Sequence, residues 1–384
     1  MSELSIPSEF RRFPSQWKVM PFLEVISDET GGNPKILTSN YQDSGILPVI
    51  DQGNSAIAGY VDDVSLKCKA KLPCILFGDH TKNFKFVDHP FALGADGVKV
   101  LIPSVDLDSK FAFHYLKQVR LPDNAGYSRH YKFLKETYIP LPPLPEQKRI
   151  AAILDKADSI RRKQQEAVRL TEELLRSVFL EMFGDPVTNP KGWKTRAFVE
   201  VCETRLGKML DANQQTGEHL RPYLRNSNVQ WDRIETSDLE LMDFKEKDRK
   251  TFSLKDGDVL ICEGGEVGRA AIWRNQMADC YFQKAIHRAR PNQSVALPEY
   301  VMFWLWFMSK NGGFKDHVTS ATIAHLTGEK LKEIQMTLPP ISLQKKYQKV
   351  YNSFFLLKNS NKLYKDETNK LFASLIKTAF SGCL

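Results

Sequence analysis

Two stretches of the chain carry apolar residues at the spacing of one helix face. The first runs from Pro145 to Phe183 without an internal glycine or proline, and its apolar stripe is Ile150, Ile153, Ala157, Ile160, Ala167, Leu174 and Val178. Proline suits the first turn of a helix, and Gly184 followed by Pro186 supplies a stop. We predict one helix, roughly 58 Å long at about 1.5 Å per residue. Because one narrow stripe cannot bury itself, this helix needs a partner of similar length.

The second stretch, Leu338 to Gly382, supplies that partner and repeats the first at an offset of 197 residues (141 to 338). At this offset Gln147 meets Gln344 and Leu174 meets Leu371, and both stretches begin with Leu-Pro-Pro. One offset held over a whole helix indicates an internal duplication. Two repeats related by a pseudo-two-fold axis would place their helices antiparallel within one chain.

The regions before the two helices repeat as well. Trp17-Lys18 meets Trp193-Lys194, and Phe22 meets Phe198, at an offset of 176 residues (17 to 193). We therefore divide the chain into a globular region 1–140, a long helix 141–185, a second globular region 186–337 and a second long helix 338–384. The predicted fold class is α+β: two mixed α/β regions separated by an antiparallel pair of long helices, with a pseudo-two-fold internal repeat.

Short apolar runs between turn residues predict strands inside both globular regions. In the first region the runs are 47–50, 74–77 and 98–102, and in the second they are 223–224, 258–262 and 285–289. A helical segment follows in each, near 108–119 and 298–310. The frameworks agree while the connecting loops differ, which is expected if both regions do one job on different targets.

Composition narrows the class of protein. The net charge of +8 is concentrated on residues 338–384, so the globular regions would bind a polyanion only through local patches. The sequence lacks an apolar run of about 18 residues, a secretory signal and a C-x-x-C pair, which predicts a cytoplasmic protein with no membrane span and no metal site. It also lacks the N-P-P-[YF], H-E-x-x-H and D…E-x-K patterns of common catalytic centres, so we expect a non-catalytic protein.

Clusters of basic, amide and aromatic residues are the candidate nucleic-acid contacts, because Arg, Lys, Asn and Gln read base edges while Lys, Ser, Thr and Tyr hold phosphates. In the first region the candidates are Lys82, Asn83, Lys85, Tyr127, Arg129, His130 and Lys132. In the second they are Arg221, Tyr223, Arg225, Asn226, Asn228, Lys284, Arg288, Thr319, Ser320 and Thr322.

The Trp-Lys start, the variable globular region, LPPLPEQKRIAAILDKAD and a long helix ending in Phe-Gly-Asp, all then repeated, resemble the DNA specificity subunit of type I restriction-modification systems. The second copy, LPPISLQKKYQKVYN, lacks the second proline, at the place of Pro145, and the glutamate, at the place of Glu146. The resemblance implies two target-recognition domains that read a bipartite site in double-stranded DNA, with the long helices as a spacer.

The resemblance further implies that the helices dock two methyltransferase (modification) subunits, and that restriction/translocase subunits join the assembly. It implies no active site and no cofactor in this chain: S-adenosylmethionine, ATP and magnesium would act in the partner subunits. The alternative from the residues alone is a non-enzymatic scaffold whose two domains bind protein partners. A DNA footprint with two protected patches would favour the first interpretation.

Overall fold

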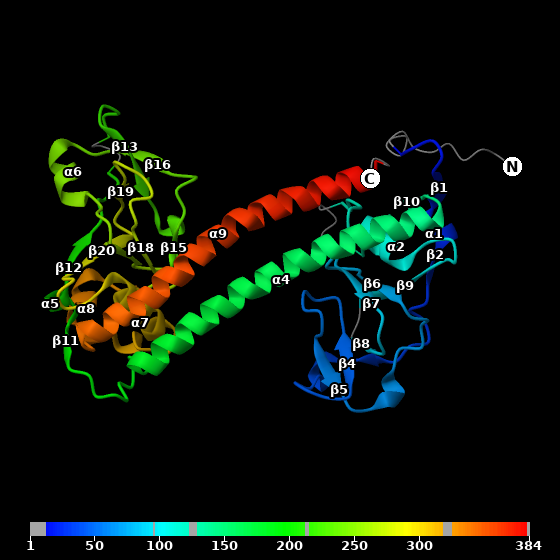
Figure 1. The fold of residues 1–384 in the computed structure, drawn as a ribbon, viewed down its shortest axis with the longest axis horizontal. Coiled ribbons are helices and arrows are strands. Elements are labelled where there is room, and N and C mark those ends of the chain that lie inside the picture. Colours follow the sequence, from blue (N-terminus) through cyan, green and yellow to red (C-terminus); the bar gives the residue numbers. More distant parts are fainter. Residues whose placement is uncertain (1–12, 95–96, 123–128, 212–214, 318–324, 382–384) are drawn as a thin grey trace. The chain divides into compact units, whose positions relative to one another are not determined.

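The structure is a computed structural model that describes residues 13–94, 97–122, 129–211, 215–317 and 325–381 (Figure 1). The chain forms two compact units. Unit 1 comprises Met1–Gln165 and Leu363–Leu384, and unit 2 comprises Glu166–Lys362. Both changes of unit fall inside a long helix, so each long helix contributes one part to each unit.

The main sheet of unit 1 is antiparallel throughout, in the order β2-β9-β6-β7. Its strands are β2 (Ile26–Asp28), β9 (Val98–Pro103), β6 (Cys74–Gly78) and β7 (Phe84–Val87). All five residues of β6 are buried, which explains its continuous apolar sequence. The predicted strands at 74–77 and 98–102 are confirmed.

A second sheet of unit 1 has the order β3-β8-β4-β5 and mixes parallel and antiparallel pairs. Its strands are β3 (Lys35–Ile36), β8 (Ala92–Gly94), β4 (Leu47–Ile50) and β5 (Gly59–Val61). A separate two-stranded ladder joins the two edges of the globular region, with β1 (Lys18–Pro21) antiparallel to β10 (Tyr138–Leu141). This ladder brings the start of unit 1 beside the strand that leads into the first long helix.

The short helices of unit 1 are α1 (Phe22–Val25), α2 (Ser109–Leu116) and α3 (Tyr131–Leu134). Asp108 caps α2 because its carboxylate accepts the backbone N–H groups of Lys110 and Phe111. One face of α2 is buried against strands β6, β7 and β9, and it contains Phe111, Ala112 and Leu116. The helical segment predicted near 108–119 is thus confirmed.

Unit 2 repeats this framework strand for strand. Its main sheet is antiparallel in the order β12-β20-β17-β18, and a ladder of β11 with β21 matches that of β1 with β10. These strands are β12 (Cys202–Leu206), β20 (Ile286–Pro291), β17 (Val259–Cys262), β18 (Ala270–Ile272), β11 (Thr195–Ala197) and β21 (Gln335–Thr337). Helices α5 (Phe198–Val201), α7 (Pro298–Lys310) and α8 (Gly328–Glu333) take the places of α1, α2 and α3.

The units differ in what is inserted into this framework. Unit 2 has a three-stranded sheet in the order β16-β13-β19, a hairpin of β14 with β15, and one further helix. Their bounds are β16 (Glu240–Asp243), β13 (Leu220–Leu224), β19 (Tyr281–Phe282), β14 (Val229–Gln230), β15 (Arg233–Ile234) and α6 (Glu246–Phe252). Divergence is therefore concentrated in the second sheet and its loops.

The two long helices are α4 (Leu144–Phe183) and α9 (Ile341–Ala379), and α4 starts one residue before Pro145. Gly184 stops α4 with a left-handed φ of 76°. In unit 1 the first turns of α4, including Ile150 and Leu154, share a core with Phe380 at the end of α9. In unit 2 the last turns of α4 share a core with the first turns of α9. The predicted antiparallel pairing is confirmed.

Aromatic rings fill the helix contact in unit 2. Phe179 is fully buried and stacks on Tyr300 and Phe307 of α7, while it makes a T-shaped contact with Tyr347 of α9. Fully burying such a side chain contributes roughly 1.5–3 kcal/mol to the free energy of folding. The helix pair is therefore held to unit 2 by side chains from three helices at once.

A buried glutamine ties the start of each long helix to its own unit. In unit 1 the Gln147 amide accepts the N–H of Asp108 at 2.8 Å and donates to the carbonyls of Asp106 and Pro142, both at 2.9 Å. In unit 2 Gln344 accepts from Leu297 N–H at 2.9 Å. It donates to the carbonyls of Val295 at 3.0 Å and Pro339 at 2.9 Å.

Candidate nucleic-acid interface

The turn between β6 and β7 gathers most of the candidate residues of unit 1. Lys82 closes this turn with a left-handed φ of 59°, and its N–H donates to the Gly78 carbonyl at 2.8 Å. His130 N–H donates to the Asp79 carbonyl at 2.9 Å, and Tyr131 N–H donates to the Asp79 carboxylate at 2.7 Å. Two predicted stretches that are far apart in sequence, 82–85 and 129–132, therefore lie side by side.

Beside this turn is a hollow of about 320 Å³ with a basic and amide lining. It is lined by Gly53, Asn54, Lys82, Asn83, Phe84, Lys85, Lys117, Val119 and Leu121. The Asn83 amide donates to the Gln52 carbonyl at 3.2 Å and to the Asn54 side chain at 2.8 Å. These bonds hold the loop around residue 53 against the turn.

Lys82 and Lys85 of this hollow are half-buried. Burial lowers the pKa of Lys85, an effect that the Asp51 carboxylate 3.7 Å away partly offsets. The Lys85 ammonium donates to the Ser55 carbonyl at 2.6 Å, and the Lys82 ammonium donates to the Pro122 carbonyl at 2.9 Å. Ammonium groups whose hydration is already reduced lose less on meeting a phosphate, so the hollow suits an anionic ligand.

Lys117 is a lining residue that the sequence did not single out. It follows the last residue of α2, and burial lowers the pKa of its ammonium, with Asp158 opposing the shift. Its place at the hollow depends on how α2 packs on β6 and β7. The run Lys117 to Arg120 at the end of the predicted helical segment was the one sequence signal available.

The remaining candidates of unit 1 differ in exposure. Arg129 and Lys132 are exposed, and the Lys132 ammonium lies 4.7 Å from the centre of the Phe133 ring. His130 is buried, and its ring Nδ1 lies 2.9 Å from the Asp79 carbonyl. His130 thus supports the turn from inside, whereas Arg129 and Lys132 face solvent.

Unit 2 builds an equivalent loop cluster with other side chains. Leu326 N–H donates to the Glu263 carbonyl at 2.9 Å, which matches the bond from His130 to Asp79. The Asn226 amide donates to the Gly264 carbonyl at 3.1 Å. A Cβ on Gly264 would come within 2.9 Å of the His325 ring, so glycine is required for this close approach.

Three candidates of unit 2 are buried and already bonded. Tyr223 donates its hydroxyl to Glu240 at 2.7 Å, and Asn228 donates to the Asp238 carboxylate at 2.7 Å. Arg288 is 3% exposed and donates to Glu203 and to the carbonyls of Thr251 and Ser253. These side chains brace the loops of unit 2 rather than face solvent.

The other candidates of unit 2 lie nearer the surface. Arg221 pairs with Asp279 at 2.6 Å, and Arg225 pairs with Glu240 and, at 3.0 Å, with Asp238. Lys284 is exposed, with its ammonium 3.9 Å from the Met209 sulfur. Four candidates, Tyr127, Thr319, Ser320 and Thr322, lie outside the described residues.

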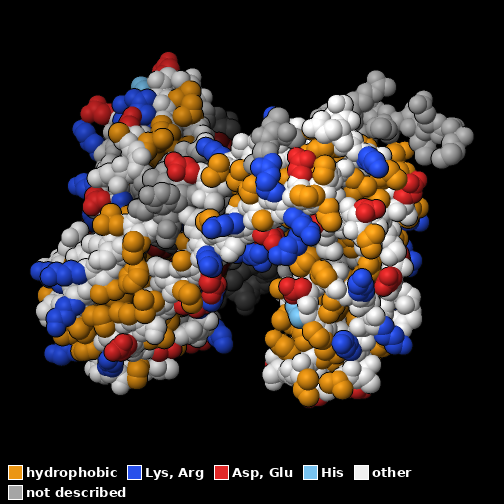
Figure 2. Space-filling view, turned by 45° about the vertical axis from the view of Figure 1, so that its right-hand side comes forward, with side chains coloured by type: hydrophobic (Ala, Val, Ile, Leu, Met, Phe, Trp, Pro, Cys, Tyr) orange, Lys and Arg blue, Asp and Glu red, His pale blue; other side chains and the backbone are white. Residues whose placement is uncertain are grey.

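The distribution of charged side chains on the surface agrees with the expectation that a polyanion would be bound through local patches and not through overall charge. Figure 2 shows lysine and arginine side chains spread over the visible face among hydrophobic and acidic ones. Among the residues that the structure describes, no three His, Cys, Asp or Glu side chains are grouped to hold a metal ion. Nor does any helix within the described ranges have the length and apolarity needed to cross a membrane.

The chain matches a known family model twice. The model described as type I restriction modification DNA specificity domain matches residues 14–171 and again residues 190–370. The putative type I restriction enzyme specificity subunit S.HindORF215P of Haemophilus influenzae is 26% identical over 364 residues, covering 90% of this chain and 89% of its own. The EcoR124I/EcoR124II specificity subunit of Escherichia coli is 21% identical over 368 residues, covering 89% and 87%.

Solved structures show the same fold. The S subunit of a type I restriction-modification system from M. genitalium superposes with a TM-score of 0.60 at 16% identity, covering 95% of this chain and 96% of its own. A chain from a type I R-M system studied for complex assembly and conformational transition gives 0.51 at 17% identity, covering 97% and 99%. At these identities the likeness establishes the fold.

Proposed function

The chain belongs to the family of type I restriction-modification DNA specificity subunits, which supply sequence specificity and are not catalytic, and we propose that each unit reads one half of a bipartite site in double-stranded DNA. The observation that carries the proposal is the duplicated framework. Both units place a loop cluster on the same strand turn, β6–β7 and β17–β18, but with different side chains. One framework with two sets of loops suits two different half-sequences.

We assign residues 1–140 and 186–337 to the target-recognition domains, and 141–185 and 338–384 to the helices between them. In the first domain the lysines of the hollow are suited to phosphates, while Asn83 and the exposed Arg129 are suited to base edges. In the second, Arg225, Asn226 and Lys284 have the same chemistry. The buried Tyr223, Asn228 and Arg288 support these loops from below.

The helix pair offers a repeated apolar strip for partner subunits. In unit 1 Ile160 of α4 and Leu371 of α9, 53% and 60% exposed, line a hollow of about 440 Å³. At the offset of 197 residues (160 to 357, 174 to 371) they correspond to Leu357 and Leu174 in unit 2, 55% and 49% exposed. Exposed apolar side chains at matching places favour protein contacts.

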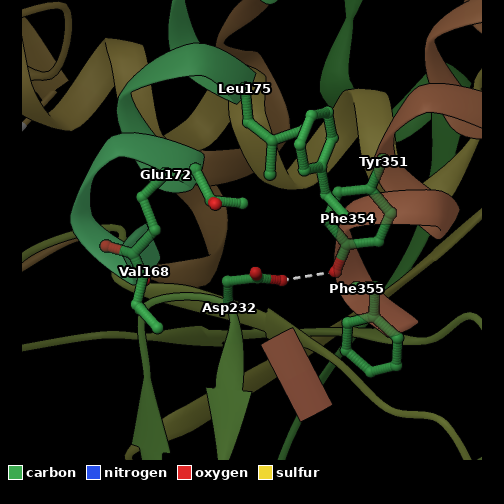
Figure 3. Close-up of a pocket in the computed structure, with 8 residues that line it drawn as sticks. Val168, Glu172, Leu175, Asp232, Tyr351, Phe354 and Phe355 are labelled. Carbon is green, nitrogen blue, oxygen red and sulfur yellow. Dashed lines mark hydrogen bonds between the residues drawn. The ribbon is translucent and has the colours of Figure 1, made fainter. Parts of the chain in front are cut away.

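Unit 2 has a smaller hollow close to its strip. Val168, Glu172 and Leu175 of α4 face Tyr351, Phe354 and Phe355 of α9 there, as Figure 3 shows. The Tyr351 hydroxyl donates to Asp232 at 2.5 Å and so links α9 to the β14–β15 turn. We propose that a methyltransferase (modification) subunit packs on the helix pair in each unit, and that restriction/translocase subunits join this complex.

The chemistry of methylation and cleavage would then reside in the partners. S-adenosylmethionine, ATP and magnesium would be bound by those subunits, and the specificity chain would act on cellular DNA in the cytoplasm. What this chain contributes is the choice of sequence.

Methylome sequencing of cells that carry this chain and its modification subunit tests the proposal. We expect methylation at one split sequence, and Arg129→Ala should relax only the half read by unit 1. Asn226→Ala should relax only the other half. Lys71→Ala is the control and should alter neither half. Lys71 is exposed and precedes the start of β6, at the end of that strand away from the β6–β7 turn. Methylation without sequence preference would contradict the proposal.

A further inference from the structure

Exposed residues near the two short helices α1 and α5 are repeated between the units although the fold does not need them. Leu23 and Glu24 of α1 correspond to Val199 and Glu200 of α5, and all four are exposed. Leu23 is 62% and Val199 49% exposed, so each unit leaves one branched apolar side chain in water beside a carboxylate.

A second repeated pair lies next to the first. The turn that ends α3 carries the exposed Lys135-Glu136, and the end of α8 carries the exposed Lys332-Glu333. In each unit the two pieces are joined by one backbone bond of 2.9 Å. Phe22 N–H donates to the Thr137 carbonyl, and Phe198 N–H donates to the Ile334 carbonyl.

Exposed positions close to these pairs in the sequence differ between the two units. Three residues before the Lys-Glu pair, unit 1 has the exposed Lys132 where unit 2 has Glu329, a reversal of charge. Two residues before the Trp-Lys pair, unit 1 has the uncharged Ser15 where unit 2 has Lys191. Buried repeats such as Phe22 and Phe198 are explained by the core, but a solvated leucine or glutamate is not.

We propose that each unit has an end surface made of four exposed residues, and that each end surface binds one copy of the same protein subunit. The end surface is Leu23, Glu24, Lys135 and Glu136 in unit 1, and Val199, Glu200, Lys332 and Glu333 in unit 2. A constraint that acts equally on both units, whose DNA-reading loops differ, fits a partner that is present twice. The proposal rests on the proposed function, in which the modification subunit is that partner.

The chemistry of the end surface selects a protein over DNA. Each end surface has two carboxylates and one ammonium group, so its net charge is negative. A negative surface would repel phosphates, whose neutralisation dominates DNA affinity. A complementary subunit would offer an apolar recess for Leu23 or Val199, with a basic and an acidic group at its rim for the glutamates and the lysine. This is an apolar contact inside a charged rim, the usual anatomy of a protein interface.

The test uses the complete complex of this chain with its modification subunit. Native mass spectrometry of a dilution series measures how many modification subunits stay bound. Leu23→Asp should weaken one bound copy by about tenfold or more, so that complexes with one modification subunit accumulate. Val199→Asp should do the same for the other copy, and the double variant should lose both. Leu37→Asp, at a 64% exposed leucine in the diverged part of unit 1, is the matched control and should keep both copies.

The outcomes separate this inference from the proposed function. If the wild-type chain binds two modification subunits and the Asp variants keep both with unchanged affinity, the end surface is not their site. If Leu23→Asp instead abolishes self-association of the free chain, or weakens DNA binding with two subunits still bound, the surface belongs to another ligand. A wild-type chain that binds no modification subunit overturns the proposed function itself.

Discussion

The buried glutamines at the starts of the long helices permit a sharp test of the fold. Gln147 is 1% exposed and makes three hydrogen bonds, of which one is accepted from Asp108 and two are donated to the carbonyls of Asp106 and Pro142. Gln147→Ala leaves one N–H and two carbonyls without these partners. A buried polar group without a partner costs about 1–3 kcal/mol. We expect Gln147→Ala to lower the free energy of unfolding by about 3–5 kcal/mol.

Two further variants separate hydrogen bonding from packing. Gln147→Met keeps a similar volume and should lose nearly as much, because it can make none of the three bonds. Gln147→Glu keeps the bond from Asp108 but turns a donor toward two carbonyls into an acceptor, so it should also destabilise at neutral pH. Protonation of this carboxyl restores one donor. Because two facing carbonyls raise the pKa of the folded carboxyl above the ordinary Glu value of about 4.3, the loss should shrink as the pH falls toward that value and stay constant below it.

Urea unfolding followed by circular dichroism measures these losses, and hydrogen exchange of the Asp108 amide reports the local bond. Gln165→Ala, an exposed glutamine on the same helix, is the control and should stay within about 0.5 kcal/mol of wild type. The equivalent change Gln344→Ala should speed exchange of the Leu297 amide instead. A loss under about 1 kcal/mol for both Gln147→Ala and Gln147→Met would refute the reasoning.

Three further predictions concern single contacts. Gly184→Ala, at a φ of 76°, should lower the free energy of unfolding by about 1–2 kcal/mol, as measured by urea unfolding with Gly31→Ala as an open-space comparison. Burial lowers the pKa of His114 and of His287 in the folded chain, so the unfolded chain binds more protons below the ordinary His pKa of about 6.5. Stability should therefore be full above that pH and fall as the pH drops below it. His287→Gln should flatten this slope, and an unchanged slope would contradict the assignment. Tyr351→Phe should cost about 1–2 kcal/mol of unfolding free energy through its lost bond to a carboxylate, as measured by urea unfolding.

Local signals were sufficient to predict the framework of this chain. Pro145, Gly184 and the apolar stripe define α4, and the buried strand β6 was visible as a continuous apolar run. The match of Gln147 with Gln344 was visible as a repeated letter, and the structure explains it as the same set of three hydrogen bonds in each unit. Elements that local sequence determines, and features that recur at a fixed offset, can therefore be predicted from one sequence.

The pairing of strands that are far apart in the sequence could not be predicted. The sheet order β2-β9-β6-β7 depends on contacts across most of unit 1, and the burial of Arg288 depends on which face of β20 is covered. Lys117 reaches the basic hollow only because α2 packs against β6 and β7. Polar residues in a predicted strand or loop look alike in the sequence whether they are buried below a surface or lie on it, so the buried Arg288 and the exposed Arg129 could not be told apart.

The helix that completes unit 1 is made long after the rest of that unit. Phe372, Leu375, Ile376 and Phe380 pack into the core that contains Phe111, yet all of unit 2 is translated in between. On the ribosome the first domain must therefore wait with an open apolar face while the second is synthesised, a state that is prone to aggregation. The nascent chain thus has a period of vulnerability in which a chaperone, or rapid assembly with another subunit, would protect it.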